Sequence, residues 1–526
     1  MRQISLTTSA LIPIFGSIFG YSDLFMDSEI LSKWVFAFLG LAVFLTTLSW
    51  TIYSCVLRKK DLTLVLTSVV VISSIEAIYG IGHFMINGFV MSESGTFDNP
   101  AGFASCLCFS LPFAFYVGHL PYGRIVSNVA IAMMITAICI SGSRVGVITA
   151  SVAIVLSLKA SVRNTLWGKW KVVVASVLFC GLLIALYLVK QDSADGRILV
   201  WCVAFMMMMD APLLGHGHGA VDREYMEYQA DFLQRFPNEH WQMLADNTKH
   251  LFNEYLEVLV QFGLIGLLLV VISFLLLLKA YKKCILDNTK YAFSSLLSIL
   301  VFSCFSYPFT YPFTCLLLAL DASLILCEAH AQQLFRLIMQ HRKTTTCCLC
   351  SMAMVVGCPT AVRCWAELEW NHAAKMQASC ATRLQRYEQL ESWLHDNPYF
   401  LYNYGVELYL ADCTEQALIV AEECSKYWTD YDLELLKAVC HSELGEYTSS
   451  DAHLARAHHM CPNRFQPLYQ QVLNLIEQGK ISAAKNLARK IMRKKVKVLS
   501  PEVQYIRNEM RGLLQKKCKK PCSNKK

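Results

Sequence analysis

Arginine residues stand at the ends of apolar runs in this 526-residue chain, where they could bind phosphate. Arg144 follows one apolar run, and Arg197 begins a mixed polar and apolar stretch. A guanidinium binds two phosphate oxygens at once and stays charged, so either residue could stabilise a departing phosphate group. A lone arginine beside an apolar run also commonly reaches lipid headgroups without a chemical role. Both interpretations stay open for both residues.

Several side chains between residues 190 and 260 could accept a proton from an attacking hydroxyl, namely His216, His218, His250 and Glu254. His216 and His218 lie in a Gly-His-Gly-His-Gly segment, most simply a flexible turn that its glycines permit. Two histidines without a carboxylate or cysteine at ligand spacing are weak evidence for a metal. The 22 cysteines mostly lie in apolar runs and form no paired ligand spacing. We therefore expect no metal site and no cofactor.

Two asparagines mark expected helix starts. Asn99 precedes Pro100, which predicts an asparagine cap and a proline in the first turn. A contact of Asn99 with a sugar or phosphate is the alternative. Asn253 and Glu254 stand at the head of a later apolar run, where they could simply cap a helix at the membrane interface. A charged Glu254 near a bilayer equally suggests function.

The elements that position these residues are membrane helices. A chain with 55% hydrophobic and 17% charged residues and a mean hydropathy of +0.39 is too apolar for a soluble globular protein. The net charge of +7 fits membrane orientation better than nucleic acid binding. We predict a transmembrane domain at 1–362. Its roughly eleven spans lie near 6–22, 31–56, 62–86, 101–120, 125–142, 145–159, 171–189, 254–279, 291–308, 311–329 and 344–362.

Positive charge predicts the orientation of these spans. Lysine and arginine occur in alternate loops, which should therefore be cytoplasmic, whereas the remaining loops carry acids. The N-terminus is then cytoplasmic, and the first span is a retained helix rather than a signal peptide. An odd number of spans sends the C-terminus outside, together with the long loop at 190–253.

Beyond Trp365 the apolar runs stop and amphipathic helical patterns begin. Gly445 and Gly479 lie one period of about 34 residues apart, each closing the first helix of a pair. Small residues recur a few positions after the corresponding turns, and Pro462 falls where such a repeat ends. Residues 397–515 thus resemble degenerate tetratricopeptide repeats that stack as a short α-helical solenoid. We expect a connecting helix at 363–396 before them and a basic, disordered tail at 516–526 after them. The small residues are Ala417, Ser450 and Ala484.

A set of short segments occurs in one order along the chain. They are 95–104 at a helix start, Ser143-Arg144, Gly196-Arg197 with Trp201, the turn at 210–215, and 252–256 followed by 263–266. Together, over roughly residues 60–330, they resemble the O-antigen ligase and O-oligosaccharyltransferase family of bacterial envelopes. The resemblance implies a membrane glycosyltransferase of GT-C type in the inner membrane. Such an enzyme moves a glycan from a polyprenyl-diphosphate carrier to an acceptor on the outer side.

The resemblance also implies roles for the residues above. We predict catalytic roles for Arg197, His250 and Glu254. We predict contacts with the diphosphate or glycan for a second group, Arg144, Asn99, His218 and Asn253. The family usually has a histidine directly before the asparagine of its helix motif, but Phe252 stands there in this chain.

This departure leaves the general base open. His250 could replace the missing histidine, the base could come from elsewhere, or the reaction could rely on leaving-group stabilisation alone. Residues two apart on a helix face different directions, so His250 can substitute only if the helix begins after it.

Other function classes stay open as well. The acceptor could be lipid A core, a protein hydroxyl, or another lipid-linked repeat unit, which would make the chain a polymerase. A non-enzymatic envelope scaffold would use the repeats to recruit a protein partner, but eleven spans exceed what an anchor needs. A transporter is disfavoured because the spans contain few ionisable residues and no inverted repeat.

Overall fold

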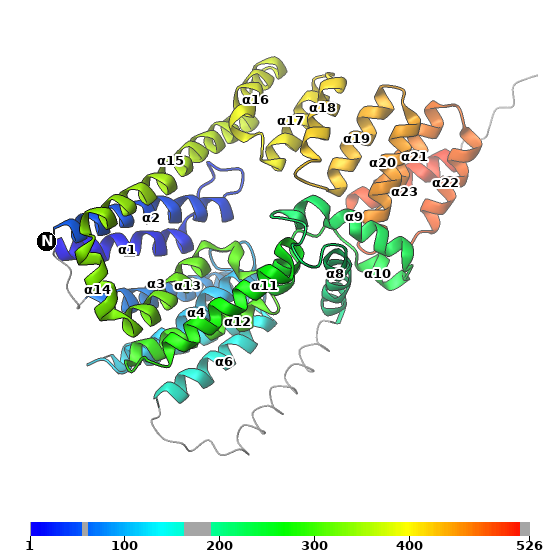
Figure 1. Ribbon diagram of the computed structural model, residues 1–526. Helices are drawn as coiled ribbons and strands as arrows, with labels where there is room; N and C mark the ends of the chain where they lie inside the picture. The colour runs from blue at the N-terminus through cyan, green and yellow to red at the C-terminus, as the bar shows by residue number, and fades with distance from the viewer. Residues whose placement is uncertain (1, 55–60, 122, 162–190, 516–526) are drawn as a thin grey trace, which may run out of the picture. The chain divides into compact units, whose positions relative to one another are not determined.

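The computed structural model describes residues 2–54, 61–121, 123–161 and 191–515. All regular secondary structure within these ranges is helical, as the all-α prediction requires (Figure 1). The chain divides into two compact units. Unit 1 comprises Met1–Val189, Phe252–Tyr255 and Ile265–Lys375, and unit 2 comprises Lys190–Leu251, Leu256–Leu264 and Met376–Lys526.

Unit 1 is a bundle of apolar helices. Its helices are α1 (Arg2–Phe19), α2 (Ile30–Tyr53), α3 (Asp61–Ile86), α4 (Pro100–Val117), α5 (Arg124–Ile140), α6 (Arg144–Ser161), α12 (Asp287–Ser303), α13 (Pro312–Ala329), α14 (Ala331–Gln340) and α15 (Arg342–Lys375). Helix α11 (Glu254–Tyr281) has its first two residues and its second half in this unit.

Six helices within the described residues are long and apolar enough to cross a membrane: α2, α3, α4, α11, α13 and α15. Shorter apolar helices occupy Leu6–Phe19, Arg124–Ile140 and Arg144–Leu158. Helix α12 covers the span expected near 291–308 but is not among the six, and the span expected at 171–189 lies outside the described residues. The chain is therefore a multi-pass membrane protein. The described residues do not support all of the eleven expected spans.

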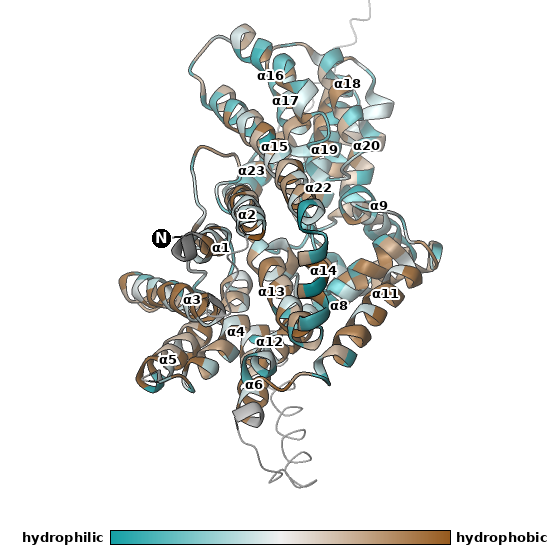
Figure 2. Cartoon of the chain, turned by 60° about the vertical axis from the view of Figure 1, so that its left-hand side comes forward, coloured by the Kyte–Doolittle hydropathy of each residue, from teal (hydrophilic) through white to brown (hydrophobic). Residues whose placement is uncertain are grey.

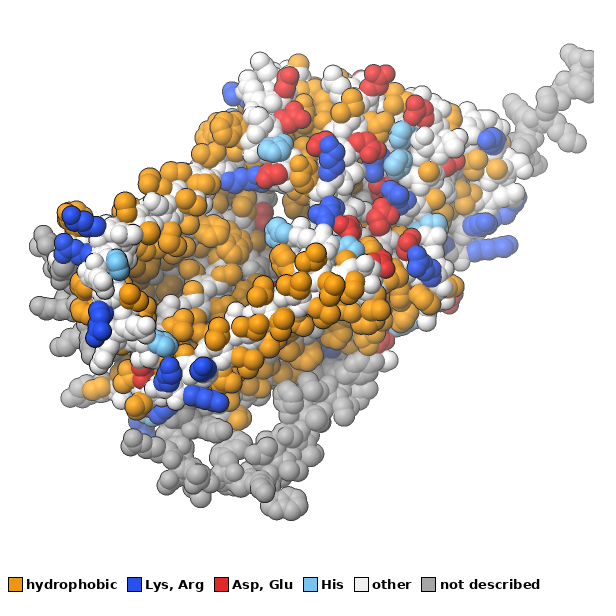
Figure 3. Space-filling model, viewed as in Figure 1, with side chains coloured by type: hydrophobic (Ala, Val, Ile, Leu, Met, Phe, Trp, Pro, Cys, Tyr) orange, Lys and Arg blue, Asp and Glu red, His pale blue; other side chains and the backbone are white. Residues whose placement is uncertain are grey.

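Apolar side chains cover the outside of these helices as well as the inside. Figure 2 shows hydrophobic residues along the length of α3, α5 and α11. Figure 3 shows a continuous hydrophobic band over α11, where Leu268, Leu269 and Leu276 are more than half exposed. Exposed leucines in such a row are typical of a lipid-facing helix.

Helix α4 forms the centre of unit 1. It is apolar on every side, which is typical of a helix surrounded by others, and 78% of its span is buried. Phe109 packs edge-on against Phe302 of α12, with ring centroids 5.5 Å apart. Small residues allow closer approach elsewhere, because a Cβ on Gly146 of α6 would lie 2.7 Å from the Cβ of Ala104.

Helix α15 corrects the expected boundary at residue 362. It runs without a break from Arg342 to Lys375, and the chain then forms a separate helix, α16 (Cys380–Leu394). The segment 363–396, expected to be one connecting helix, instead consists of the end of α15 and a second helix, α16. The composition changes from apolar to polar within α15, but no helix-breaking residue follows Pro359 there, so the helix continues. Ser379 caps the new helix by accepting from Thr382 N.

Unit 2 joins the long loop to the C-terminal helices. The loop forms α8 (Gln191–Asp210), α9 (Ala220–Arg235) and α10 (Glu239–Leu244). After α16, consecutive helices pack against one another from α17 to α23 (Figure 1). They are α17 (Pro398–Leu410), α18 (Thr414–Cys424), α19 (Tyr431–Glu443), α20 (Tyr447–Met460), α21 (Gln466–Glu477), α22 (Ile481–Arg493) and α23 (Pro501–Gln515).

The expected glycines and small residues of the repeat pattern have clear structural roles. Gly445 and Gly479 follow α19 and α21 with φ angles of +78° and +73°, a conformation that favours glycine. Ala417, Ser450 and Ala484 are fully buried in α18, α20 and α22. Each glycine of this spacing therefore ends one helix, and each small residue is buried in the helix that follows a turn.

Candidate functional site

The first residues of α4, α11 and α13 meet at one end of unit 1. The Asn99 side-chain amide donates to the Tyr311 hydroxyl at 2.5 Å, which links the starts of α4 and α13. Glu254 Oε1 accepts from the main-chain N–H of Phe309 at 2.9 Å, which links α11 to the turn before α13. Helix N-termini carry partial positive charge, and the carboxylates of Asp98 and Glu254 lie at this same end.

Helix α6 begins at the same end. Arg144 is its first residue and is half-buried, and Ser143 caps the helix by accepting from Gly146 N at 3.1 Å. Gly146, near the start of α6, packs against Ala104, which lies one turn after the start of α4. The two helices therefore begin close together. Arg144 therefore adds a full positive charge to the end of the bundle where the other N-termini gather.

Asn99 acts as the cap that its position before Pro100 predicted. Its Oδ1 accepts from Ala101 N and Gly102 N, both at 2.9 Å. Its amide also donates to the Tyr307 hydroxyl at 3.2 Å. These bonds hold Asn99 within the protein, so its structural role is clear and its contact with substrate stays a prediction.

Tyr311 is a residue that the sequence analysis missed. Its hydroxyl donates to Asp98 at 2.6 Å, and a Cβ on Gly102 would lie 2.5 Å from its ring. The repeated Tyr-Pro pairs at 307–308 and 311–312 were the available signal.

Two buried charges anchor the loop that carries Asp98 and Asn99. Glu76 accepts from Thr96 N at 2.8 Å and from the Thr96 hydroxyl at 3.1 Å, and Lys33 donates to Thr96 O at 2.6 Å. Lys33 is 1% exposed and Glu76 is fully buried. Ionisable residues inside apolar runs are costly, and this signal could have identified both of them. Their role here is to position the residues before α4.

Asn253 and Phe252 shape the start of α11. Asn253 Oδ1 accepts from Tyr255 N at 3.0 Å, the capping role that was the simpler of the two interpretations. Phe252 has a φ of +55°, and its ring packs against Tyr307 with centroids 5.4 Å apart. Phenylalanine thus takes a packing role where the resembled family has its histidine.

Helix α11 breaks at Gly263, where φ is +63° and ψ is −163°. The break leaves main-chain groups without helical partners, and the turn after α8 satisfies them. The N–H groups of His216 and Gly217 donate to Val260 O and Gln261 O, both at 2.9 Å. The Gly-His-Gly-His-Gly segment is therefore a turn hydrogen-bonded to the break in α11, and Gly215, Gly217 and Gly219 take the positive φ angles that glycine permits.

The two histidines of this segment have different surroundings. His216 Nδ1 lies 2.7 Å from Glu224 Oε2, and its Nε2 lies 2.8 Å from Met207 O. Both ring nitrogens of His216 are thus engaged, which indicates a structural role. His218 is exposed, and its Nδ1 lies 3.2 Å from Gln261 Oε1.

The hydrogen-bond network assigns the tautomer of His218. The Gln261 amide nitrogen donates to Glu257 Oε1 at 3.0 Å, so its oxygen faces the imidazole. A histidine that donates from Nδ1 to an oxygen keeps the Nε2 lone pair available as an acceptor. His218 therefore has the form that a general base needs.

Charged groups surround His218 on α9, on α11 and on the segment between them. Asp222 and Glu257 interact electrostatically with each other and with His218, and Lys249 lies close to Asp222. Burial raises the pKa of Asp222, while the positive charge of Lys249 acts in the opposite direction.

Arg197 lies in the second turn of α8 and is half-buried. Trp201, one turn later on the same face, donates from its indole to Leu251 O at 2.9 Å. That face of α8 thus lies against the extended segment that carries His250. Because α11 begins at Glu254, His250 meets the condition set above for replacing the missing histidine.

The loop helices pack on the C-terminal helices within unit 2. Gln229 of α9 is 1% exposed, and its amide donates to Met460 O at 2.8 Å. Asn463 donates to Ala245 O at 2.6 Å, and Thr429 N donates to Asp222 O at 2.9 Å. These bonds hold the loop helices against the C-terminal helices within unit 2.

Residues 129–271 match the O-Antigen ligase family. A comparison with curated proteins finds no match. The matched region runs from α5 to the second half of α11 and contains all of the predicted site residues except Asn99. It supports, in general terms, a membrane enzyme that transfers or ligates a glycan. Within the described ranges, no group of three or more His, Cys, Asp or Glu side chains could hold a metal ion.

Proposed function

We propose that this protein is an inner-membrane glycosyltransferase. It moves a glycan from a polyprenyl-diphosphate carrier to an acceptor hydroxyl on the periplasmic side, as an O-antigen ligase or a protein O-oligosaccharyltransferase. The observation that carries the proposal is the O-antigen ligase match over 129–271, which includes Arg144, Arg197 and His218. Two features support it further: Arg144 stands at the start of α6, and the hydrogen bonds of His218 suit a base.

The reaction has one bond to form and one to break. The acceptor oxygen attacks the anomeric carbon, and the bond from that carbon to the diphosphate oxygen breaks. The diphosphate leaves with the electron pair and remains on the lipid. Arg197 binds the departing phosphate oxygens, with Arg144 as the alternative residue for this role, and a preorganised contact of this kind lowers the barrier by on the order of 2–4 kcal/mol.

His218 is our candidate for the base that takes the proton of the acceptor hydroxyl. Gln261 fixes its tautomer, and its ring is exposed. His250 is the second candidate, because it precedes the start of α11. Glu254 holds the main chain before α13, so we assign it a positioning role instead of the catalytic role first predicted.

The proposal includes an orientation. Unit 2 lies in the periplasm with the long loop, the N-terminus is cytoplasmic, and the C-terminal helix pairs are tetratricopeptide-like repeats. They hold the loop helices of their own chain and leave their remaining surface to a protein partner. We propose that transfer needs no divalent metal. Loss of purified activity in chelator, with recovery on adding a metal ion, would contradict that.

The glycan profile of a deletion strain tests the function. We expect the glycan to be lost from its acceptor while the lipid-linked chain accumulates. Loss from lipid A core identifies a ligase, and loss from glycoproteins identifies a protein transferase. Shortened chains would identify a polymerase instead. A normal profile would contradict the proposal.

A further inference from the structure

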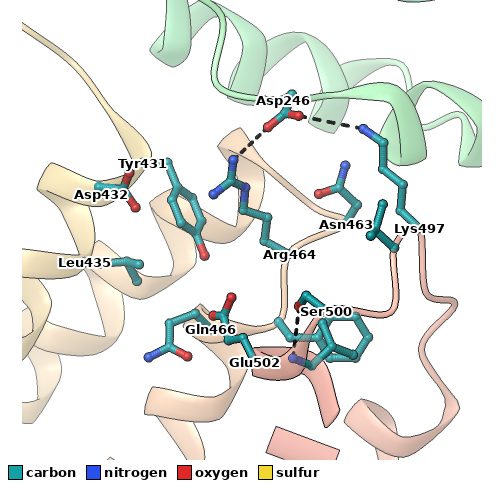
Figure 4. Close-up of a pocket in the computed structure, with 13 residues that line it drawn as sticks. Asp246, Tyr431, Asp432, Leu435, Asn463, Arg464, Gln466, Lys497, Ser500 and Glu502 are labelled. Atoms are coloured by element: carbon teal, nitrogen blue, oxygen red, sulfur yellow. Dashed lines mark hydrogen bonds and ion pairs between the residues drawn. The ribbon is translucent and has the colours of Figure 1, made fainter. Parts of the chain in front are cut away.

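Unit 2 contains a cavity of about 360 Å³ between the outer loop and the repeats (Figure 4). Asp246 of the loop forms one side, and Tyr431 and Asp432 of α19 form another. Gln466 at the start of α21 and Glu502 in the first turn of α23 add further polar groups to the lining. This volume lies within the range of small-ligand sites.

The charges of the cavity disfavour an anion. Arg464 contacts Asp246 at 2.8 Å, and Lys497 lies 3.9 Å from the other oxygen of the same carboxylate (Figure 4). Both cations are thus directed at one acid. Asp432 and Glu502 remain, so three carboxylates stand against two cations. A phosphate or an acidic sugar would meet a net negative lining.

Hydrogen-bonding capacity remains open around this cavity. Among the described residues, the side chains of Asp432, Gln466 and Glu502 make no hydrogen bond to the protein. Figure 4 shows the Tyr431 hydroxyl directed toward Gln466. Val498, which is 68% exposed, adds apolar surface at the rim. The lining therefore offers acceptors for several donors, one amide that donates, and an apolar patch.

We propose that this cavity binds a neutral segment of the glycan. Sugar hydroxyls donate to the two carboxylates and accept from the Gln466 amide, while a ring C–H face packs on Val498. The inference rests on the proposed function, which brings a glycan to the side of the membrane where unit 2 lies. A basic peptide is the competing ligand for the same carboxylates.

Binding to the full-length chain in phosphatidylcholine nanodiscs tests this. The probe is the oligosaccharide released by mild acid from the lipid-linked donor of the host, observed by saturation-transfer difference NMR. Gln466→Ala and Glu502→Ala should each weaken binding on the order of tenfold, since each removes a polar contact. Gln470→Ala and Glu415→Ala, which lie outside the cavity, should leave binding unchanged.

Three results would overturn the inference. The first is no saturation transfer with the unsubstituted chain, and the second is equal binding of the oligosaccharide by the cavity variants. The third is binding of tetralysine, but not of the oligosaccharide, in the cavity. Glycan transfer measured on the same preparations separates the two claims. Glycan transfer without oligosaccharide binding would contradict the inference and leave the proposed function standing. Oligosaccharide binding without any glycan transfer would contradict the proposed function and leave the binding site standing.

Discussion

A Cβ atom on Gly263 would lie 2.7 Å from the main-chain nitrogen of Gly215. The break in α11 and the histidine turn therefore fit together through two residues without side chains. The N–H of Leu264 donates to Pro212 O at 2.9 Å on the other side of the break. This interlock holds His218 against Gln261 and couples a membrane helix to the loop of unit 2.

Gly263→Ala should separate the turn from α11. Alanine is strained at a φ of +63°, and its Cβ would also lie 2.3 Å from Leu213 O. We expect a stability loss of at least about 1–3 kcal/mol and loss of glycan transfer. Thermal unfolding in detergent and transfer in cells measure the two effects. Gly82→Ala, with open space around it in α3, should change neither. Full transfer by Gly263→Ala would show that the interlock is dispensable.

His218→Gln should lower kcat by about 10²–10⁴-fold, the usual contribution of a general base. Transfer rates at saturating donor and acceptor measure the effect. His216→Gln is the matched control for a nearby histidine whose nitrogens are both engaged. It should reduce stability but keep the kcat of the unsubstituted enzyme. If His218→Gln keeps that kcat as well, the base lies elsewhere and His250 is the next residue to test.

His458 makes the repeats sensitive to acid. Burial, with nearby Lys494 and His459, lowers its pKa to about 4. The unfolded chain therefore binds a proton at higher pH than the folded chain, and stability falls as the pH drops from about 6.5 to about 4. The loss of folding free energy should be on the order of 2–3 kcal/mol.

Hydrogen exchange of α20 at pH 7 and pH 5, corrected for intrinsic rates, measures this loss. His458→Gln should remove much of the difference, whereas exposed His395→Gln should not. Equal protection of α20 at both pH values would contradict the assignment.

The topology can be tested with fused reporters. A reporter after Pro501 should be active only if it works in the periplasm, since the positive loops predict that the loop and the repeats lie there. A reporter within the 282–286 loop should show the opposite behaviour. Cytoplasmic activity of the fusion after Pro501 would reverse the orientation.

The sequence predicted local features of the site well. The cap at Asn99 follows from one asparagine before one proline, and the turns at Gly445 and Gly479 follow from one period. These features depend on neighbouring residues, which the sequence displays directly.

Contacts between distant segments could not be predicted in this way. Lys33 meets Thr96 across 63 residues, and Gln229 meets Met460 across 231. The break at Gly263 was hidden because an apolar run has the same composition whether its helix is continuous or interrupted. The assignment of a tautomer to His218 depends on Gln261, 43 residues away.

Arg197 is the residue on which leaving-group stabilisation depends most. Arg197→Ala should lower the transfer rate by about 30- to 1000-fold, which corresponds to about 2–4 kcal/mol. Arg197→Lys keeps the charge but loses the two-pronged contact, so it should stay impaired. Both variants should reach the membrane in normal amounts. Near-normal transfer by Arg197→Ala would move the role to Arg144.

Transfer by the purified chain tests the central claim most directly. The full-length protein in nanodiscs is mixed with radiolabelled polyprenyl-diphosphate glycan and an acceptor extract from the deletion strain. The account predicts labelled acceptor and an equal amount of glycan-free polyprenyl diphosphate, with both products reduced together in Arg197→Ala. Labelled acceptor formed equally by the variant, or no labelled acceptor from a folded, unsubstituted chain, would contradict it.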